Sequence, residues 1–456
     1  MLTPTALPSS YRDNDGFVFK QDGKYYRLIK PSYFSHYNLL MNSGLYKILT
    51  DAGRLVKHEE INVGSFSQIT QDKIILPEQI PFISYPYEWS FDMWRDAAIV
   101  TLKIASQALD FGMILKDATP FNIQFYKGRP VFIDTLSFEK YEKGTSWIAY
   151  HQFCECFLGP LLLMHYGHRD LGKLFLVYPN GIPLDIIKSL LPFKSNFNIH
   201  VYLHIWLQAK MANKPRVEEA EKVEFPKQKL LTLLQGLTSF VSGLSQKKMK
   251  STWDDYYTET ILGNQYLDFK KSLVSKFANS IEFKSVIDLG ANDGCFSLLL
   301  HDKAENIIAT DSDSNCINEL YKKIRKDKIK NIVPLVSSLN TPSPSIGWNN
   351  EERNSLTQRL NADLVLALAL FHHLAIGVNI PLSFLAKWLS KMGTYLIIEF
   401  IPKSDEKVKQ LLKNREDIFD EYGLESFKKI FSEFFEIILE EKVGNTERVL
   451  FLMKRR

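Results

Sequence analysis

Short apolar runs, separated by amphipathic segments or polar loops, recur along the second half of the chain. They lie at residues 285–289, 306–310, 332–339, 362–370 and 394–401. Such runs are typical of parallel strands covered on both faces, and the segments between them have helical spacing, including a helix expected at residues 350–360. Two further runs, at residues 436–443 and 448–453, meet at Gly444-Asn445 and predict an antiparallel hairpin. The pattern therefore predicts an α/β domain with a Rossmann-like sheet that ends in a hairpin.

The first half of the chain has a mixed pattern. Residues 16–29 hold two β-rich runs around Asp22-Gly23, which is a strong hairpin signal. Residues 37–51 and 91–111 have apolar positions at helical spacing. We therefore expect an α+β region over residues 1–210, a linker with a bridging helix over 211–250, and the α/β domain over 251–456.

Composition narrows the classes of function. The 456 residues are 45% apolar and 24% charged, with a net charge of +4, which suits a globular protein of two or three domains. Dense stripes of Lys and Arg with interleaved aromatic residues are missing, so nucleic acid is not an expected partner. Four cysteines do not make a disulfide scaffold. The first residues lack a signal-peptide pattern and no apolar stretch is long enough to cross a bilayer, so we expect a cytoplasmic protein.

The turn after the first of the apolar runs carries the candidate chemistry. It reads Asp288-Leu289-Gly290-Ala291-Asn292-Asp293-Gly294, and asparagine is the non-glycine residue that best tolerates a positive φ. In a βαβ unit such a turn places backbone N–H groups and a helix N-terminus at the carboxyl edge of the sheet, where a nucleotide-like ligand lies. The G-x-G-x-x-G of dinucleotide folds is absent. The residues alone leave open a ligand such as NAD, or no ligand.

This turn resembles motif I of the class I S-adenosylmethionine (SAM) dependent methyltransferases, and the resemblance extends over residues 252–456. It implies that Asp288 helps to hold the cationic methionine end of SAM, and that Asp311, which ends the next strand, holds the ribose hydroxyls. Residues 252–257 correspond to an aromatic lid in many of these enzymes, or begin a packed helix. The remaining cofactor-binding residues that the resemblance implies are Gly290, Asn292, Asp293, Gly294, Ser338 near the adenine amino group, and Leu370.

The run at residues 362–370 leads into Phe371-His372-His373-Leu374, at a strand end that faces the methyl group in the family. Three signatures of other methyltransferases are missing here: the N/D-P-P-Y/F tetrad, a cysteine nucleophile and the Lys-Asp-Lys-Glu set. The His pair resembles the HHL of small-molecule and lipid-type methyltransferases. A histidine can accept a hydroxyl proton during methyl transfer, so His372 and His373 are candidate catalytic residues, with Glu399 orienting the substrate or a histidine. Alternatively, one histidine lines the cofactor pocket and the other stabilises the strand end.

A second set of polar residues lies in the first half, in LKDATPFN and FIDTLSFE. These segments resemble the catalytic segment of the protein-kinase and aminoglycoside-phosphotransferase superfamily. The resemblance implies that Asp117 accepts the proton of the acceptor hydroxyl and that Asn122 and Asp134 bind Mg²⁺ with ATP. A G-x-G-x-x-G and a clear strand-borne Lys are missing, although Lys20 or Lys30 would serve. Alternatively, the three residues only cap turns and end a strand.

The layout as a whole resembles a group of bacterial SAM-dependent methyltransferases, some of them linked to nodulation and surface-glycan genes. The resemblance implies transfer of a methyl group from SAM to an oxygen of a sugar or another small molecule, with the kinase-like region serving recognition or regulation. Two alternatives remain. One is a bifunctional phosphotransferase and methyltransferase, and the other is a non-catalytic module that binds SAM as a sensor.

Overall fold

The structure of the protein is a computed structural model that describes residues 5–61, 72–212, 225–246, 263–413 and 415–456. The chain divides into two compact units. The first comprises Met1–Lys248 with Ser345–Asn354, and the second comprises Met249–Pro344 with Ser355–Arg456. The segment Ser345–Asn354, which we expected in the C-terminal domain, thus packs with the first unit. In the described ranges, no helix has the length and apolar character needed to cross a membrane.

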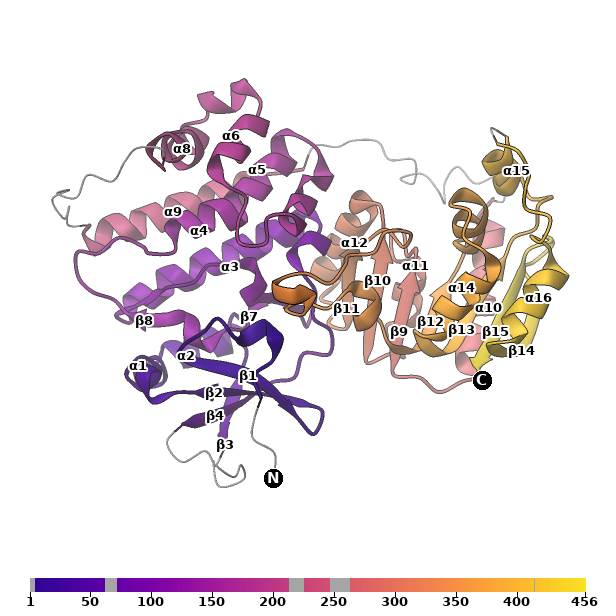
Figure 1. The fold of residues 1–456 in the computed structure, drawn as a ribbon, viewed down its shortest axis with the longest axis horizontal. Helices are drawn as coiled ribbons and strands as arrows, with labels where there is room; N and C mark the ends of the chain where they lie inside the picture. The colour runs from indigo at the N-terminus through magenta and orange to yellow at the C-terminus, as the bar shows by residue number, and fades with distance from the viewer. Residues whose placement is uncertain (1–4, 62–71, 213–224, 247–262, 414) are drawn as a thin grey trace. The chain divides into compact units, whose positions relative to one another are not determined.

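The first unit begins with an antiparallel sheet. Its strands are β1 (Gly16–Gln21), β2 (Lys24–Ile29), β3 (His58–Ile61) and β4 (Lys73–Pro77), in the order β1-β2-β4-β3 (Figure 1). Asp22 and Gly23 have φ of 50° and 79°, as expected for a two-residue hairpin. The helix expected at residues 37–51 is instead two helices, α1 (Phe34–Asn42) and α2 (Leu45–Asp51). Gly44 separates them because its φ of 93° does not fit a helix.

The rest of the first unit is mainly helical. The long helix α3 (Phe91–Asp110) is followed by two short antiparallel pairs, β5 (Met113–Leu115) with β8 (Phe138–Lys140), and β6 (Ile123–Tyr126) with β7 (Arg129–Phe132). A sheet followed by a helical part agrees with the predicted α+β architecture. The remaining helices are α4 (Tyr150–Phe153), α5 (Gly159–Tyr166), α6 (Leu184–Leu190), α7 (Ile199–Val201), α8 (Leu207–Ala212) and α9 (Lys227–Gly243).

The second unit is built on one seven-stranded sheet. Its strands are β9 (Ser285–Leu289), β10 (Asn306–Asp311), β11 (Ile332–Val336), β12 (Ala362–Ala367), β13 (Gly393–Phe400), β14 (Phe435–Lys442) and β15 (Val449–Arg455), in the order β11-β10-β9-β12-β13-β15-β14. The first five strands are parallel, and β15 runs antiparallel to both β13 and β14. This order, with its closing hairpin, is that of class I methyltransferases and confirms the predicted fold class.

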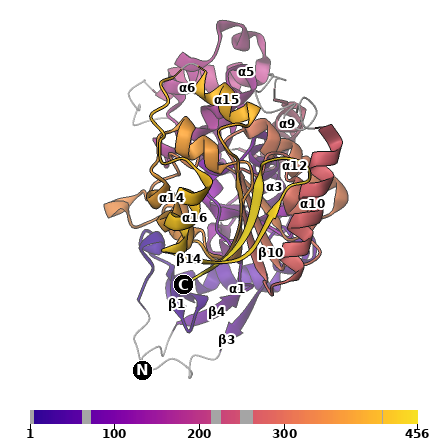
Figure 2. The same ribbon diagram turned by 90° about the vertical axis from the view of Figure 1, so that its right-hand side faces the viewer.

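Helices cover both faces of this sheet. The sheet lies between α10 (Gly263–Asn279) on one side and α14 (Leu382–Ser390) and α16 (Leu424–Ser432) on the other (Figure 2). Central strand residues such as Val286, Leu366 and Ile397 are fully buried in the core. The other helices are α11 (Cys295–Leu300), α12 (Ser314–Asp327), α13 (Leu356–Arg359) and α15 (Glu406–Leu412).

The helix expected at residues 350–360 is wrong in its length. It is reduced to α13, which begins at Leu356 because Ser355 is its N-cap and forms a capping box with Gln358. The residues before it follow another course: Ile346 and Arg353 form an isolated antiparallel bridge within the segment that packs with the first unit.

Candidate active site

The turn between β9 and α11 is tight and is held against β10. Gly290, Asn292 and Gly294 have φ of 70°, 52° and 79°, a conformation that glycine and asparagine adopt at least cost. The N–H groups of Gly290 and Ala291 both donate to the Thr310 carbonyl at 2.9 Å. A Cβ atom on Gly294 would lie 2.4 Å from Leu320 Cδ1, so a side chain at this position does not fit. The turn is thus fixed by its glycines and by β10.

Two of the predicted cofactor-binding residues, Gly290 and Leu370, lie in contact at this turn. A Cβ atom on Gly290 would lie 3.3 Å from Leu370 Cδ1, so Leu370, just beyond β12, packs on the turn backbone. Asp293 is exposed, and its Oδ1 accepts the Cys295 N–H at 3.3 Å at the start of α11. The Asp293 carboxylate is therefore engaged by the helix start.

Asp311 lies at the end of β10, beside the turn. Its Oδ2 accepts the Asn292 N–H and its Oδ1 accepts the Asp313 N–H, each at 2.8 Å. Burial raises the pKa of Asp311, although these N–H groups act in the opposite direction. Because the two oxygens of a carboxylate have about four lone-pair sites, the carboxylate keeps acceptor capacity. On the neighbouring strand end, the Ser337 N–H donates to the Asp311 carbonyl at 2.7 Å, and the Ser338 hydroxyl hydrogen-bonds to the Asn340 side chain.

Asp288, next to the last residue of β9, lies in a different environment. It is 2% exposed, and its Oδ2 accepts the Ser297 hydroxyl at 2.7 Å. Burial raises the pKa of Asp288 to about 6, because the charged form loses its hydration. The groups around Asp288 thus offset only part of the cost of burying its negative charge.

The His pair follows β12 at a strained part of the backbone. Ala369 has a φ of 51°, which is unusual for a residue other than glycine and costs free energy. His372 is fully buried, and neither of its ring nitrogens has a hydrogen-bond partner among the described residues. His373 is partly exposed and begins a π-helical turn, η12 (His373–Gly377). The two rings lie 4.1 Å apart, centroid to centroid.

Both histidines are held in the neutral state. Burial lowers the pKa of His373 to about 4. Burial, with the neighbouring His373, lowers the pKa of His372 well below its ordinary value. A neutral imidazole has one unprotonated nitrogen, although a lowered pKa makes that nitrogen a weaker base than that of an ordinary histidine.

Glu399, on β13, is the centre of a buried ionic network. Its carboxylate accepts hydrogen bonds from the Lys270 ammonium at 2.6 Å, from the Tyr266 hydroxyl, and from the Ala369 N–H at 2.8 Å. Arg448 Nη1 lies 3.8 Å away and donates to the Tyr266 hydroxyl at 2.8 Å. Burial opposes ionisation, but Lys270 and Arg448 outweigh it and lower the pKa of Glu399. Glu399 thus binds the strained Ala369 backbone, and none of its hydrogen bonds goes to a histidine.

In the first unit, the structure brings the kinase-like residues together. Asn122 Nδ2 donates to Asp117 Oδ2 at 3.1 Å and to the Ser137 hydroxyl oxygen at 3.2 Å, and the Ser137 hydroxyl donates to Asp134. Burial, and then the charge of Asp134, raise the pKa of Asp117. The three predicted residues therefore share one hydrogen-bonded cluster.

The cation at this cluster is one that the sequence pattern did not single out. The Arg27 guanidinium, on β2, pairs with Asp134 and lies 3.4 Å from Asp13. Lys30 instead donates to the Asn14 carbonyl at 3.0 Å, and the Lys20 ammonium lies 5.2 Å from the centre of the Tyr25 ring. The available signal was weak, because the second run of the hairpin contains two basic residues, Lys24 and Arg27. Across the described ranges, no group of three or more His, Cys, Asp or Glu side chains is arranged to hold a metal ion.

The aromatic segment at residues 252–257 lies outside the described residues. Its predicted role as a lid stays a prediction.

Comparisons with known proteins give one relative over the whole chain. The nodulation protein NoeA of Rhizobium meliloti (strain 1021) is 33% identical over 463 residues, which span 99% of this chain and 96% of the relative. No family model matches. Among solved structures, the N-methyltransferase NodS from Bradyrhizobium japonicum WM9 has 10% identity and a TM-score of 0.32, with 43% of this chain and 99% of that chain covered. The bifunctional kinase-methyltransferase WbdD has 17% identity and a TM-score of 0.29, with 48% and 45% covered.

Proposed function

The chain belongs to the family of the nodulation protein NoeA, and from this premise we propose that its second unit transfers a methyl group from SAM to an oxygen of a sugar or another small molecule. The observation that carries the proposal is the pairing of a glycine-fixed turn with the Asp311 carboxylate. Both stand at the carboxyl edge of a sheet with the class I methyltransferase strand order, which is where open α/β sheets bind ligands.

The residues present fit SAM. Asp311 would accept the ribose hydroxyls, because its carboxylate keeps acceptor capacity beside its bonds to backbone N–H groups. Asp288 would meet the ammonium of the methionine end, because it is a buried acid whose raised pKa shows that Ser297 and the charge of Lys270 compensate its burial only in part. Leu370 would pack beside the cofactor, as it does on the turn. SAM supplies a methyl group on a positively charged sulfur, which is already activated for transfer.

His373 is the residue that we assign to the acceptor hydroxyl. It is neutral, because its pKa is about 4, and it is partly exposed whereas His372 is fully buried. One imidazole nitrogen of His373 would take the hydroxyl proton as the oxygen is methylated, while the turn and the strand ends hold the two reactants in line. His372 packs behind His373, and Glu399 positions both through its hydrogen bond to the Ala369 N–H.

An oxygen acceptor is favoured by the residues at the end of β12. The side chains there are two neutral histidines, and neither a cysteine nor a Pro-Pro-aromatic segment follows the strand. A neutral histidine suits the removal of a hydroxyl proton. A sugar agrees with the surface-glycan proteins that the sequence resembles.

The test combines substrate discovery with two matched variants. The full chain is incubated with methyl-labelled SAM and fractionated sugars and glycans, and labelled products are identified by mass spectrometry. We expect labelled O-methyl products and S-adenosylhomocysteine. His373→Ala should lower kcat by about 10²–10³-fold with unchanged SAM affinity, and His372→Ala should lower it less. Label on nitrogen would contradict the oxygen acceptor, and SAM binding without any S-adenosylhomocysteine would leave the sensor alternative.

A second candidate function is phosphotransfer by the first unit. The cluster of Asp117, Asn122 and Asp134 favours it. Against it, Arg27 already neutralises Asp134, and Mg²⁺ at that carboxylate would have to displace or repel a guanidinium. We therefore propose recognition or regulation for this unit. Mg²⁺ with ATP should leave its thermal unfolding unchanged. A Mg²⁺-dependent stabilisation that is lost in Asp134→Ala would instead assign a nucleotide site.

A further inference from the structure

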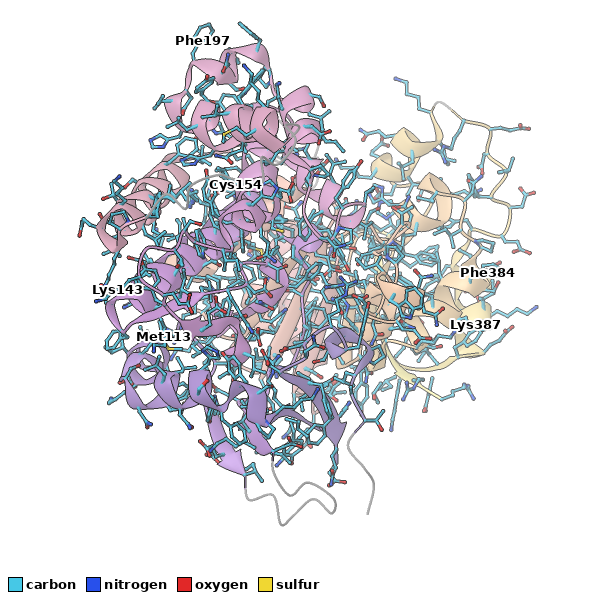
Figure 3. All side chains as sticks on the ribbon, turned by 60° about the vertical axis from the view of Figure 1, so that its left-hand side comes forward. Met113, Lys143, Cys154, Phe197, Phe384 and Lys387 are labelled. Atoms are coloured by element: carbon cyan, nitrogen blue, oxygen red, sulfur yellow. The ribbon has the colours of Figure 1, made fainter. Side chains whose placement is uncertain are left out.

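Large apolar side chains are exposed together on the helical part of the first unit. They lie at the end of α6, on the short helix η9 (Phe193–Phe197) and at the start of α7. Phe197, labelled in Figure 3, is 82% exposed, Phe193 is 69% exposed and Ile199 is 61% exposed. We call Leu190, Phe193, Phe197 and Ile199 the aromatic face. Exposure of this degree at successive large side chains marks a contact surface.

Ring contacts join this face into one surface. Phe193 lies 5.9 Å from Phe197 and 6.4 Å from Trp206, centroid to centroid and with the rings perpendicular in both cases. Trp206 belongs to the π-helical turn η10 (Tyr202–Trp206). The exposed rings of Phe193 and Phe197 therefore contact each other, and Phe193 also contacts the partly buried Trp206.

Lysines outnumber acidic residues in the described chain at the aromatic face. Residues 184–212, from α6 to α8, contain Lys188, Lys194 and Lys210 and one acidic residue, Asp185. The Lys188 ammonium lies 5.3 Å from the centre of the Trp206 ring, at the border of the face. Residues 225–246, which include α9, lack acidic side chains, and His200 stacks on Phe240 of α9 at 4.7 Å. The exposed rings are thus bordered by cations.

The combination of residue types identifies the occupant. Protein interfaces are depleted in lysine, whereas surfaces that lie on membranes combine Phe and Trp with lysines that meet anionic headgroups. We propose that the aromatic face docks on the surface of an anionic lipid bilayer. Phe193 and Phe197 enter the boundary between headgroups and acyl chains, and Lys188 and Lys194 contact lipid phosphates.

Vesicle flotation of the full chain tests this proposal. The vesicles contain phosphatidylcholine alone, or phosphatidylcholine with phosphatidylglycerol. We expect flotation with the anionic vesicles, weakened by salt. The variant Phe193→Ser/Phe197→Ser should lower the partition coefficient by about tenfold or more, and Lys188→Gln/Lys194→Gln should lower it for anionic vesicles alone.

The second unit offers a matched control. Phe384 on α14 is 67% exposed, and Lys387 lies on the same helix; Figure 3 labels both. The variant Phe384→Ser/Lys387→Gln should float like the unchanged protein. Circular dichroism establishes that each variant is folded.

Three outcomes would overturn the proposal. The first is no flotation of the unchanged protein with anionic vesicles. The second is equal flotation of Phe193→Ser/Phe197→Ser. The third is sedimentation of the unchanged protein as a dimer that this variant abolishes, without flotation, because the occupant would then be a second copy of the chain.

Discussion

Replacing Asp288 with asparagine should stabilise the second unit at neutral pH. Asp288 is fully buried in the core at the end of β9, and its pKa is raised from 3.8 to about 6 by burial. The folded protein therefore binds this proton more tightly than the unfolded chain does. The free energy of unfolding therefore falls as the pH rises from about 4 to about 6. Above about pH 6 the full cost of the buried charge is present.

The size of the effect follows from the pKa. A shift of about two units corresponds to about 3 kcal/mol at pH 7.5, and to about 1.5 kcal/mol at pH 5, where the folded carboxyl is still mostly protonated. Asparagine keeps one oxygen for the Ser297 donors, whose hydroxyl lies 2.7 Å from Asp288 Oδ2, and has no charge to bury; a weakened bond to the Ser297 N–H offsets part of the gain. For a unit of this size, about 3 kcal/mol raises the Tm by about 6–12 °C.

Differential scanning calorimetry without ligand, at pH 5 and pH 7.5, measures the difference directly. Asp302→Asn is the matched control, because the Asp302 side chain is 90% exposed, and it should change stability by less than about 0.5 kcal/mol. A destabilised Asp288→Asn variant at pH 7.5 would refute the reasoning, and so would a stabilisation equal at the two pH values. If Asp288 serves a cationic ligand, the same variant should bind SAM more weakly, so stability and binding move in opposite directions.

Three further predictions concern the same unit. Asp311→Ala should weaken SAM binding by about 1–3 kcal/mol through the loss of charge-assisted hydrogen bonds; calorimetric titration that gives an unchanged Kd would remove the ribose assignment. Gly294→Ala should cost about 1–3 kcal/mol of stability, because its φ is 79° and the new Cβ would lie 2.4 Å from Leu320, whereas Gly377→Ala, with no atom within 4 Å, should be nearly neutral in urea denaturation. Glu399→Gln should lower the free energy of unfolding by about 3–5 kcal/mol, because it leaves Lys270 buried without its carboxylate. Adding Lys270→Met should recover part of this loss in a double-mutant cycle. Fully additive effects of the two substitutions would contradict a direct pair.

Local patterns predicted what depends on neighbours in the sequence. The Asp22-Gly23 hairpin, the order of strands and helices in the second unit, and the closing hairpin all follow from periodicity and turn residues. The turn at Gly290 and Gly294 was visible because only a few residue types tolerate positive φ. The break between α1 and α2 was missed because a glycine inside a helical pattern also occurs in continuous helices.

Contacts between distant segments carry no such signal. Lys270 and Glu399 are 129 residues apart in the chain, Tyr266 and Arg448 are 182 apart, and Arg27 and Asp134 are 107 apart. Each residue alone is an unremarkable polar position, and only the fold brings the charges together. The packing of Ser345–Asn354 with the first unit was likewise unseen, although the excess length of the polar loop before it was a hint.

The two buried carboxylates Glu399 and Asp288 of the second unit differ in how far the protein itself compensates their charge. Glu399 is fully buried and has Lys270 and Arg448 beside it, so its pKa is lowered and its charge is compensated within the protein. Asp288 is equally buried, yet its hydrogen bonds come from the neutral hydroxyl and N–H groups of Ser297, and burial outweighs these and the charge of Lys270, so its pKa is raised to about 6. Lys270 pairs with Glu399, and its charge lowers the pKa of Asp288 too little to offset burial there. We infer that the missing positive charge at Asp288 is the one that a cationic cofactor supplies, which is why removing the acid should stabilise the empty protein and weaken its binding of SAM.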